Sequence, residues 1–166
     1  MGSAPRRGST RSVRRGRTSG QVRLRRCKWD AGRCKTLFES LDYLYLPAPD
    51  IEASVTFYTQ VLGGTLLWRV RDGLTWVAAV RLAQQGPQVL LATHLEGGHG
   101  LLIYRVTNLA ATRRALIDRG WSAEGDLFEI PQGPCLVLRD PAGQRLAVYQ
   151  LVRPSMDEHF HGRFDT

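Results

Sequence analysis

The chain has 166 residues, of which 43% are apolar, and this length supports one domain with a real core or two very small ones. No apolar run approaches the roughly 20 residues of a membrane helix, and the N-terminus lacks the apolar stretch of a secretory signal. The three cysteines, Cys27, Cys34 and Cys135, are too few for a disulfide framework. We therefore expect an ordinary soluble globular protein of the cytoplasm, without membrane contact.

The net charge of +8 is unevenly distributed along the chain. Residues 1–40 hold 12 of the 23 Lys and Arg residues and only two acids, whereas residues 41–166 hold 11 arginines and 13 acids. The basic charge therefore belongs to a leader rich in Gly, Ser and Arg, which we expect to be disordered because it lacks aliphatic periodicity. The rest of the chain is mildly acidic, so nucleic acid binding could rest only on the leader.

Three interpretations of the leader remain open. It could be a basic arm that contacts phosphates, or an organelle transit peptide, which is also rich in Arg and poor in acids. It could also be sequence upstream of a later translation start, with Val13, Val22 or Leu37 at the alternative start codon. We favour the third interpretation. We expect neither nucleic acid binding nor a metal site at the widely spaced pair of Cys27 and Cys34.

From residue 41 the pattern indicates a strand, a helix and three more strands. The first strand is LDYLYL at 41–46, and Asp50 is a good N-cap for the helix that follows. Spacings of four, three and four residues predict one apolar face of that helix, formed by Ile51, Val55, Tyr58 and Leu62. The three further strands are expected at 65–71, 74–82 and 88–94.

The same order of elements follows a second time. LLIYRV at 101–106 is a strand, Asn108 is the N-cap, and the helix spans 109–120. Three strands are again expected, near 126–130 and at 134–140 and 144–151.

The two units match each other at an offset that aligns Asp50 with Asn108. A βαβββ unit cannot close its own sheet, so two copies are expected to pair. The sequence thus predicts an α+β fold in which two βαβββ modules, about 41–94 and 99–152, pair into one curved, groove-forming mixed sheet. Residues 153–166 are expected to form a frayed acidic tail.

This layout, together with the run FYTQVLGG and the turn DPAGQRL, resembles the vicinal oxygen chelate superfamily. That group contains glyoxalase, extradiol dioxygenases and bleomycin-resistance proteins, and the resemblance covers residues 41–152. Enzymes of the group typically hold a divalent metal with His, Gln or Glu on the first and last strands of each unit. The resemblance places the four ligand positions at Tyr43, at about Leu90, at Leu101 and at Ala147.

These four residues do not make a competent set of metal ligands. Leu and Ala offer no donor atom, and a phenol with a pKa near 10 binds the usual divalent ions poorly at neutral pH. We therefore expect a member of a metal-free branch, with no cofactor and no catalytic residues. A displaced metal site built from His94, Glu96 and His99 remains an alternative.

Strand alternation from the implied ligand positions selects the side chains that face the groove. Asp42 alternates to the helix-packed side, and Cys135 is expected to be a buried strand residue. Alternation does not fix the facing of the two tryptophans, which border the same cavity. The expected ligand-binding residues are Tyr43, Tyr45, Trp68, Trp76, Ile103, Arg105, Arg145 and Tyr149.

A groove of aromatic rings with a few arginines suits a planar or amphipathic small molecule, and an anionic group could pair with Arg145 or Arg105. We expect a small-molecule-binding protein of the glyoxalase/bleomycin-resistance type that binds without a metal and forms a homodimer. One alternative is a metal-dependent lyase, isomerase or dioxygenase with a rearranged ligand set. Another is a regulatory module whose basic leader contacts nucleic acid. In a third, the tyrosines of the groove are core residues that bind no ligand.

Overall fold

The computed structural model describes residues 36–95, 99–122, 125 and 127–166, without the side chain of Asp157. The expectations for residues 1–35, and for Glu96 as a metal ligand, lie outside this part of the chain.

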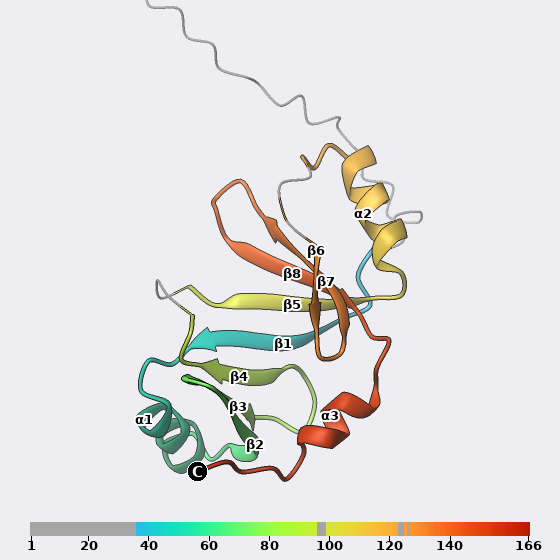
Figure 1. Cartoon of the computed structure of the whole chain (residues 1–166). Helices are drawn as coiled ribbons and strands as arrows, with labels where there is room; N and C mark the ends of the chain where they lie inside the picture. The colour runs from blue at the N-terminus through green and yellow to red at the C-terminus, as the bar shows by residue number, and fades with distance from the viewer. Residues whose placement is uncertain (1–35, 96–98, 123–124, 126) are drawn as a thin grey trace, which may run out of the picture.

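Eight strands form one sheet in the order β2-β3-β4-β1-β5-β8-β7-β6 (Figure 1). β1 pairs antiparallel with β5, and each module has one further parallel pair, β1 with β4 and β5 with β8. The predicted α+β fold, with two βαβββ modules in one curved mixed sheet, is confirmed. The strands are β1 (Ser40–Pro47), β2 (Thr65–Asp72), β3 (Thr75–Arg81), β4 (Gln88–Ala92), β5 (Leu101–Val106), β6 (Leu127–Ile130), β7 (Gly133–Arg139) and β8 (Arg145–Gln150).

Each module contributes one helix after its first strand, and both predicted N-caps are confirmed. The side chain of Asp50 accepts a hydrogen bond of 2.9 Å from the amide of Ala53, and Asn108 accepts one of 2.8 Å from Ala111. The helices are α1 (Ile51–Thr56), its π-helical continuation η1 (Phe57–Val61), α2 (Leu109–Asp118) and the C-terminal α3 (Ser155–Phe160).

The apolar face of the first helix is shorter than the spacing predicts. Ile51 and Val55 are buried, but Leu62 is 48% exposed. The cause is the π-helical turn, in which the amide of Leu62 donates to the carbonyl of Phe57, five residues back. This wider turn rotates later residues away from the position that a regular α-helix would give them.

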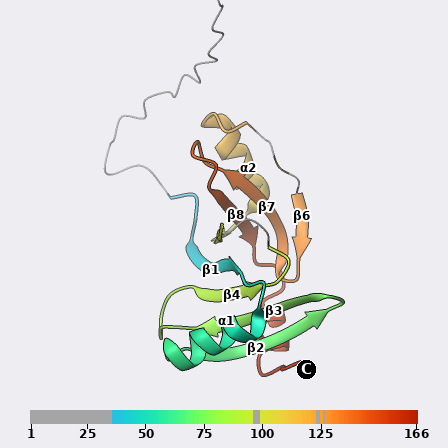
Figure 2. The same ribbon diagram turned by 90° about the vertical axis from the view of Figure 1, so that its left-hand side faces the viewer.

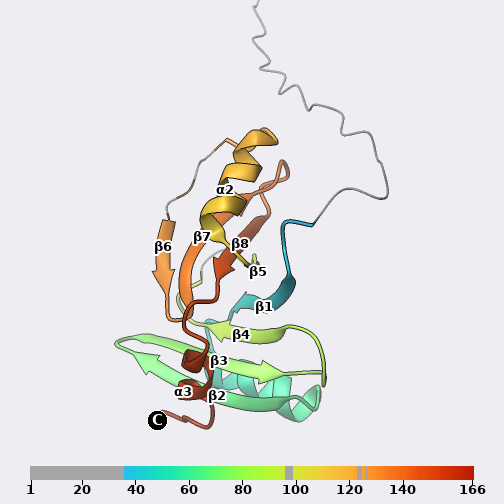
Figure 3. The same ribbon diagram turned by 90° about the vertical axis from the view of Figure 1, so that its right-hand side faces the viewer.

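The sheet separates two layers of packed side chains. On one face α1 covers a cluster that includes Val80 and Leu91, and α2 covers a second cluster that includes Leu136 and Val148. The opposite face carries Tyr43, which packs with Ile103, Ala147 and Tyr149. We call this opposite face, which α1 and α2 leave free, the concave face. Figures 2 and 3 show the two modules stacked one above the other, with the C-terminus near β2.

The expected frayed tail is wrong, because the C-terminal segment packs on the first module. α3 places Phe160 against Trp68, with ring centroids 5.4 Å apart. Beyond the helix, the amide of Gly162 donates to the carbonyl of Leu67, and the amide of Arg69 donates to the carbonyl of Arg163. The tail therefore covers the edge of the sheet at β2, a long-range contact that tail composition does not encode.

A β-bulge in β1 places Asp42 on the concave face, so the expectation that it faces the helices is wrong. The pairing with β5 shifts between Leu41 and Tyr43, and the extra residue breaks the alternation of side chains. Asp42 Oδ2 accepts a hydrogen bond of 2.6 Å from the Tyr149 hydroxyl and lies 3.5 Å from Arg105 Nε. Tyr149 is 1% exposed. The pKa of its phenol is raised mainly by burial and secondly by the hydrogen bond to Asp42.

We predict that Tyr149→Phe lowers the free energy of unfolding by about 1–2 kcal/mol, because the Asp42 carboxylate loses a buried donor. Urea unfolding at neutral pH measures this change. Tyr104→Phe is the matched control, since Tyr104 lies on the opposite face of the sheet, next to Phe38. It is expected to change stability by less than about 0.5 kcal/mol. Equal losses in the two variants would show that the Asp42 contact does not stabilise the fold.

Candidate ligand-binding site

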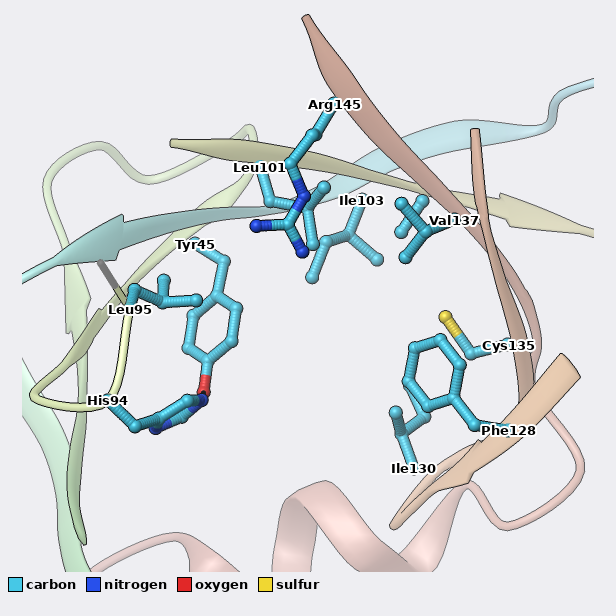
Figure 4. A pocket seen from close by; sticks show the side chains of 11 residues that line it. Tyr45, His94, Leu95, Leu101, Ile103, Phe128, Ile130, Cys135, Val137 and Arg145 are labelled. Carbon is cyan, nitrogen blue, oxygen red and sulfur yellow. Dashed lines mark hydrogen bonds between the residues drawn. The ribbon is translucent and has the colours of Figure 1, made fainter. Parts of the chain in front are cut away.

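The concave face holds a cavity of about 450 Å³, which lies mainly over the second module and is bounded on one side by Tyr45, His94 and Leu95 (Figure 4). Most of its lining is aliphatic or aromatic, with few polar groups. The lining residues are Tyr45, His94, Leu95, Leu101, Ile103, Phe128, Ile130, Cys135, Val137, Arg145 and Ala147.

Alternate residues of neighbouring strands build the floor of this pocket. Tyr45 on β1 stands opposite Leu101 on β5, and Ile103 stands beside Ala147 on β8. Ala147 in turn pairs with Val137 on β7. Because side chains alternate along each strand, these residues project to the same face and form a continuous apolar surface.

Three polar groups accompany the apolar side chains, namely the Tyr45 hydroxyl, the His94 ring and the Arg145 guanidinium. On one side the Tyr45 hydroxyl and His94 Nε2 are 3.1 Å apart, and burial raises the pKa of Tyr45 to about 12. The phenol therefore stays protonated at neutral pH and is a hydrogen-bond donor. Arg145 extends into the pocket from β8, and among the described residues it forms no ion pair. Such a site offers a cation and a neutral donor on an apolar surface.

Three of the eight expected ligand-binding residues line this pocket: Tyr45, Ile103 and Arg145. Tyr43 and Tyr149 lie beside it on the same face as core residues, 5% and 1% exposed, with ring centroids 6.0 Å apart.

Arg105 and the two tryptophans also lie outside the pocket lining. Arg105 is 3.5 Å from both Glu39 and Asp42, at the far end of the concave face. Trp68 is on the concave face but is covered by Phe160. Trp76 packs with the cluster under α1, on the opposite face, so the expectation that it borders the groove is wrong.

The missed lining residues come from the β4–β5 connection and from β6 and β7. Phe128 and Ile130 lie on β6, an edge strand whose pairing with β7 brings Phe128 opposite Cys135. Cys135 is buried, as expected, but its side chain faces the pocket rather than the core layer between the sheet and the helices. Alternation along β7 could have identified Cys135 and Val137, whereas the contribution of His94 depends on how its loop folds back toward Tyr45.

The four positions that the resemblance implies for a metal do not suit one here. Leu101 and Ala147 line the pocket with hydrocarbon. Leu90 packs against the core cluster that contains Leu101 and Ala147, and Tyr43 is buried against Tyr149. Across the described residues, no group of three His, Cys, Asp or Glu side chains has a geometry suited to a metal ion. His94, considered as part of a displaced ligand set, instead contacts the Tyr45 hydroxyl.

Burial raises the pKa of the Cys135 thiol to about 11, partly offset by a hydrogen bond from the Leu136 amide. Because the folded state favours the neutral thiol, the proton on Cys135 does not oppose folding below about pH 9. As the pH rises toward 11, the unfolded chain loses this proton more readily than the folded chain, and the free energy of unfolding falls. We predict that unfolding free energy falls more between pH 8 and 10.5 in the wild type than in Cys135→Ala, by about 1–2 kcal/mol. Denaturant unfolding under reducing conditions measures the unfolding free energy at each pH. Equal falls in the wild type and in Cys135→Ala would contradict a buried, neutral thiol.

Comparison with known proteins supports the architecture. The family model described as Glyoxalase/Bleomycin resistance protein/Dioxygenase superfamily matches residues 40–148. The crystal structure of methylmalonyl-CoA epimerase from Mycobacterium tuberculosis is similar with a TM-score of 0.61 and 16% identity, over 73% of this chain and 93% of that chain. A search of curated proteins finds no significant match.

Two further solved structures show the same fold. A variant of Streptomyces coelicolor methylmalonyl-CoA epimerase in complex with 2-nitronate-propionyl-CoA has a TM-score of 0.56 and 14% identity, over 70% of this chain and 99% of that chain. A hypothetical protein from Bacillus halodurans has a TM-score of 0.51 and 14% identity, over 67% and 93% of the two chains. At such identities the structures establish the fold alone. The family match, which spans residues 40–148, shows that this chain belongs to the Glyoxalase/Bleomycin resistance protein/Dioxygenase superfamily.

Proposed function

We propose that this protein binds an amphipathic organic anion in the pocket of its second module, without a metal ion. The observation that carries the proposal is the placement of Arg145 at an apolar cavity, with no acidic partner among the described residues. A guanidinium at such a site favours an anionic ligand group, because the low-polarity surroundings strengthen the attraction between opposite charges. The apolar lining then takes up the hydrocarbon or aromatic body of the ligand.

The Tyr45 and His94 pair adds a second point of recognition. Its pKa of about 12 keeps the Tyr45 phenol neutral. When His94 Nε2–H donates to the phenol oxygen, the phenol hydrogen is free to donate to a ligand oxygen. Figure 4 shows Tyr45 and His94 on one side of the pocket and Phe128 and Ile130 on the other. A flat or extended ligand body would therefore pack between an aromatic pair and an apolar wall.

The residues at the metal positions support the metal-free form of this proposal over the alternative of a metal-dependent lyase, isomerase or dioxygenase. Leu101 and Ala147 offer no donor atoms, and hydrocarbon at these places favours apolar ligand contacts.

Homodimer formation and a cytoplasmic location are further parts of the proposal. They rest on the family resemblance and on the small number of cysteines. In the described part of the chain, no helix has the length and apolar character needed to cross a membrane.

We predict that the protein binds 8-anilinonaphthalene-1-sulfonate, and that Arg145→Gln weakens this binding by about tenfold or more, since a charge-assisted contact is lost. Binding of N-phenyl-1-naphthylamine, which has the same rings without the sulfonate, is expected to change little. Fluorescence titration measures both affinities, before and after treatment with EDTA, which is expected to have no effect.

Arg81→Gln is the matched control, because it removes the same charge from an exposed position at the end of β3. Its affinity for the sulfonate is expected to equal that of the wild type. Equal weakening by the two substitutions would mean that general charge attraction, rather than Arg145, accounts for binding. Loss of binding on EDTA treatment, restored by a divalent metal, would favour the metal-dependent alternative.

A further inference from the structure

The floor of the pocket continues across the sheet into the first module. Tyr45 on β1 pairs with Leu90 on β4, Leu90 with Ala79 on β3, and Ala79 with Trp68 on β2. Leu90 packs both with the core cluster under the pocket and with the cluster around Trp68. The concave face therefore has one apolar row that runs from Leu101, through Tyr45, to Trp68.

The first-module end of this row is filled by the chain's own C-terminal helix. Phe160 on α3 packs against the cluster of Leu67, Trp68 and Ala79, and its ring centroid is 5.4 Å from that of Trp68. Beneath it Ala79 is fully buried and Trp68 is 8% exposed. An apolar side chain of the protein itself therefore covers the first-module end of the row.

α3 lies on the side of the pocket away from Arg145 (Figure 4). In Figure 4 Arg145 lies at the top of the pocket, and the faint red ribbon of α3 crosses the bottom. An apolar body that follows the row from Tyr45 to Trp68 would approach α3.

The tail is also held by hydrogen bonds that do not involve the Phe160 ring. The amide of Asp165 donates to the carbonyl of Arg69 at 2.9 Å, and the Arg69 guanidinium donates to the carbonyl of Asp165 at 3.0 Å. The Asp165 side chain also accepts a bond of 3.0 Å from the amide of Arg71. A change confined to the ring can therefore open the row while these bonds keep the segment in place.

We propose that Phe160 sets the maximum length of the ligand, by closing the groove at the end opposite Arg145. This inference rests on the proposed binding of an amphipathic anion in the same pocket. In the wild type, an apolar chain reaches the α3 side of the pocket and gains no further contact. In Phe160→Ala, the row over Leu90 and Ala79 opens, and a longer chain gains contact with Trp68.

The test uses unbranched carboxylates of six to fourteen carbons, with affinities measured by isothermal titration calorimetry on the full chain. Affinity is expected to rise by about fourfold for each added methylene that is buried, and to reach a plateau in the wild type. In Phe160→Ala the plateau is expected at a chain several carbons longer. Phe164→Ala is the matched control, because this residue lies on the same tail but is 53% exposed, and its profile should equal that of the wild type.

The outcomes separate the inference from the function on which it rests. If the wild type and Phe160→Ala bind with the same length profile, the pocket binds amphipathic anions and the role of Phe160 is refuted. If neither protein binds any carboxylate, the proposed function and the inference are refuted together. Phe160→Leu keeps an apolar cover and is expected to give an intermediate plateau, which preserves the test if alanine disturbs the tail.

Discussion

The antiparallel pairing of β1 with β5 is the interaction on which the rest of this structure depends. It joins two four-stranded modules into one sheet and sets Tyr45 opposite Leu101, and Tyr43 opposite Ile103. Since side chains alternate along a strand, a shift of one residue in this register would turn these side chains toward the helices. The floor of the pocket exists because this one register places residues of both modules on the same face.

The two modules share an order of elements but use their concave faces differently. In the first, the face around Trp68 is covered by Phe160 and by a tail that pairs with β2. In the second, the face remains accessible and carries Arg145 beside apolar side chains. The concave face is therefore asymmetric, because Arg145 lies at the pocket of the second module and the ring of Phe160 packs over the first. In the proposed function, this asymmetry favours ligands with one anionic and one apolar end. Three of the four positions that the family resemblance implies for a metal, Leu90, Leu101 and Ala147, carry hydrocarbon side chains.

Local patterns in the sequence predicted the elements well, and long-range contacts account for most of the errors. Hydrophobic alternation identified the strands, and Asp50 and Asn108 marked the helix starts because capping is a local interaction. The bulge at Asp42 and the π-helical turn before Leu62 interrupt the regular periods of 2.0 and 3.6 on which those predictions rely. The packing of the tail, the facing of the tryptophans and the contact of His94 with Tyr45 depend on residues far apart in sequence.

The central claim is that an organic anion binds between Arg145 and the apolar floor of the second module. The most direct measurement is a titration of the ¹⁵N-labelled full chain with 8-anilinonaphthalene-1-sulfonate, followed by the amide and arginine Nε–H signals in two-dimensional NMR. The account predicts the largest shifts at Tyr45, Leu101 and the Arg145 side chain. Largest shifts at Arg113 and Arg114, which line a separate depression beside α2, would contradict it.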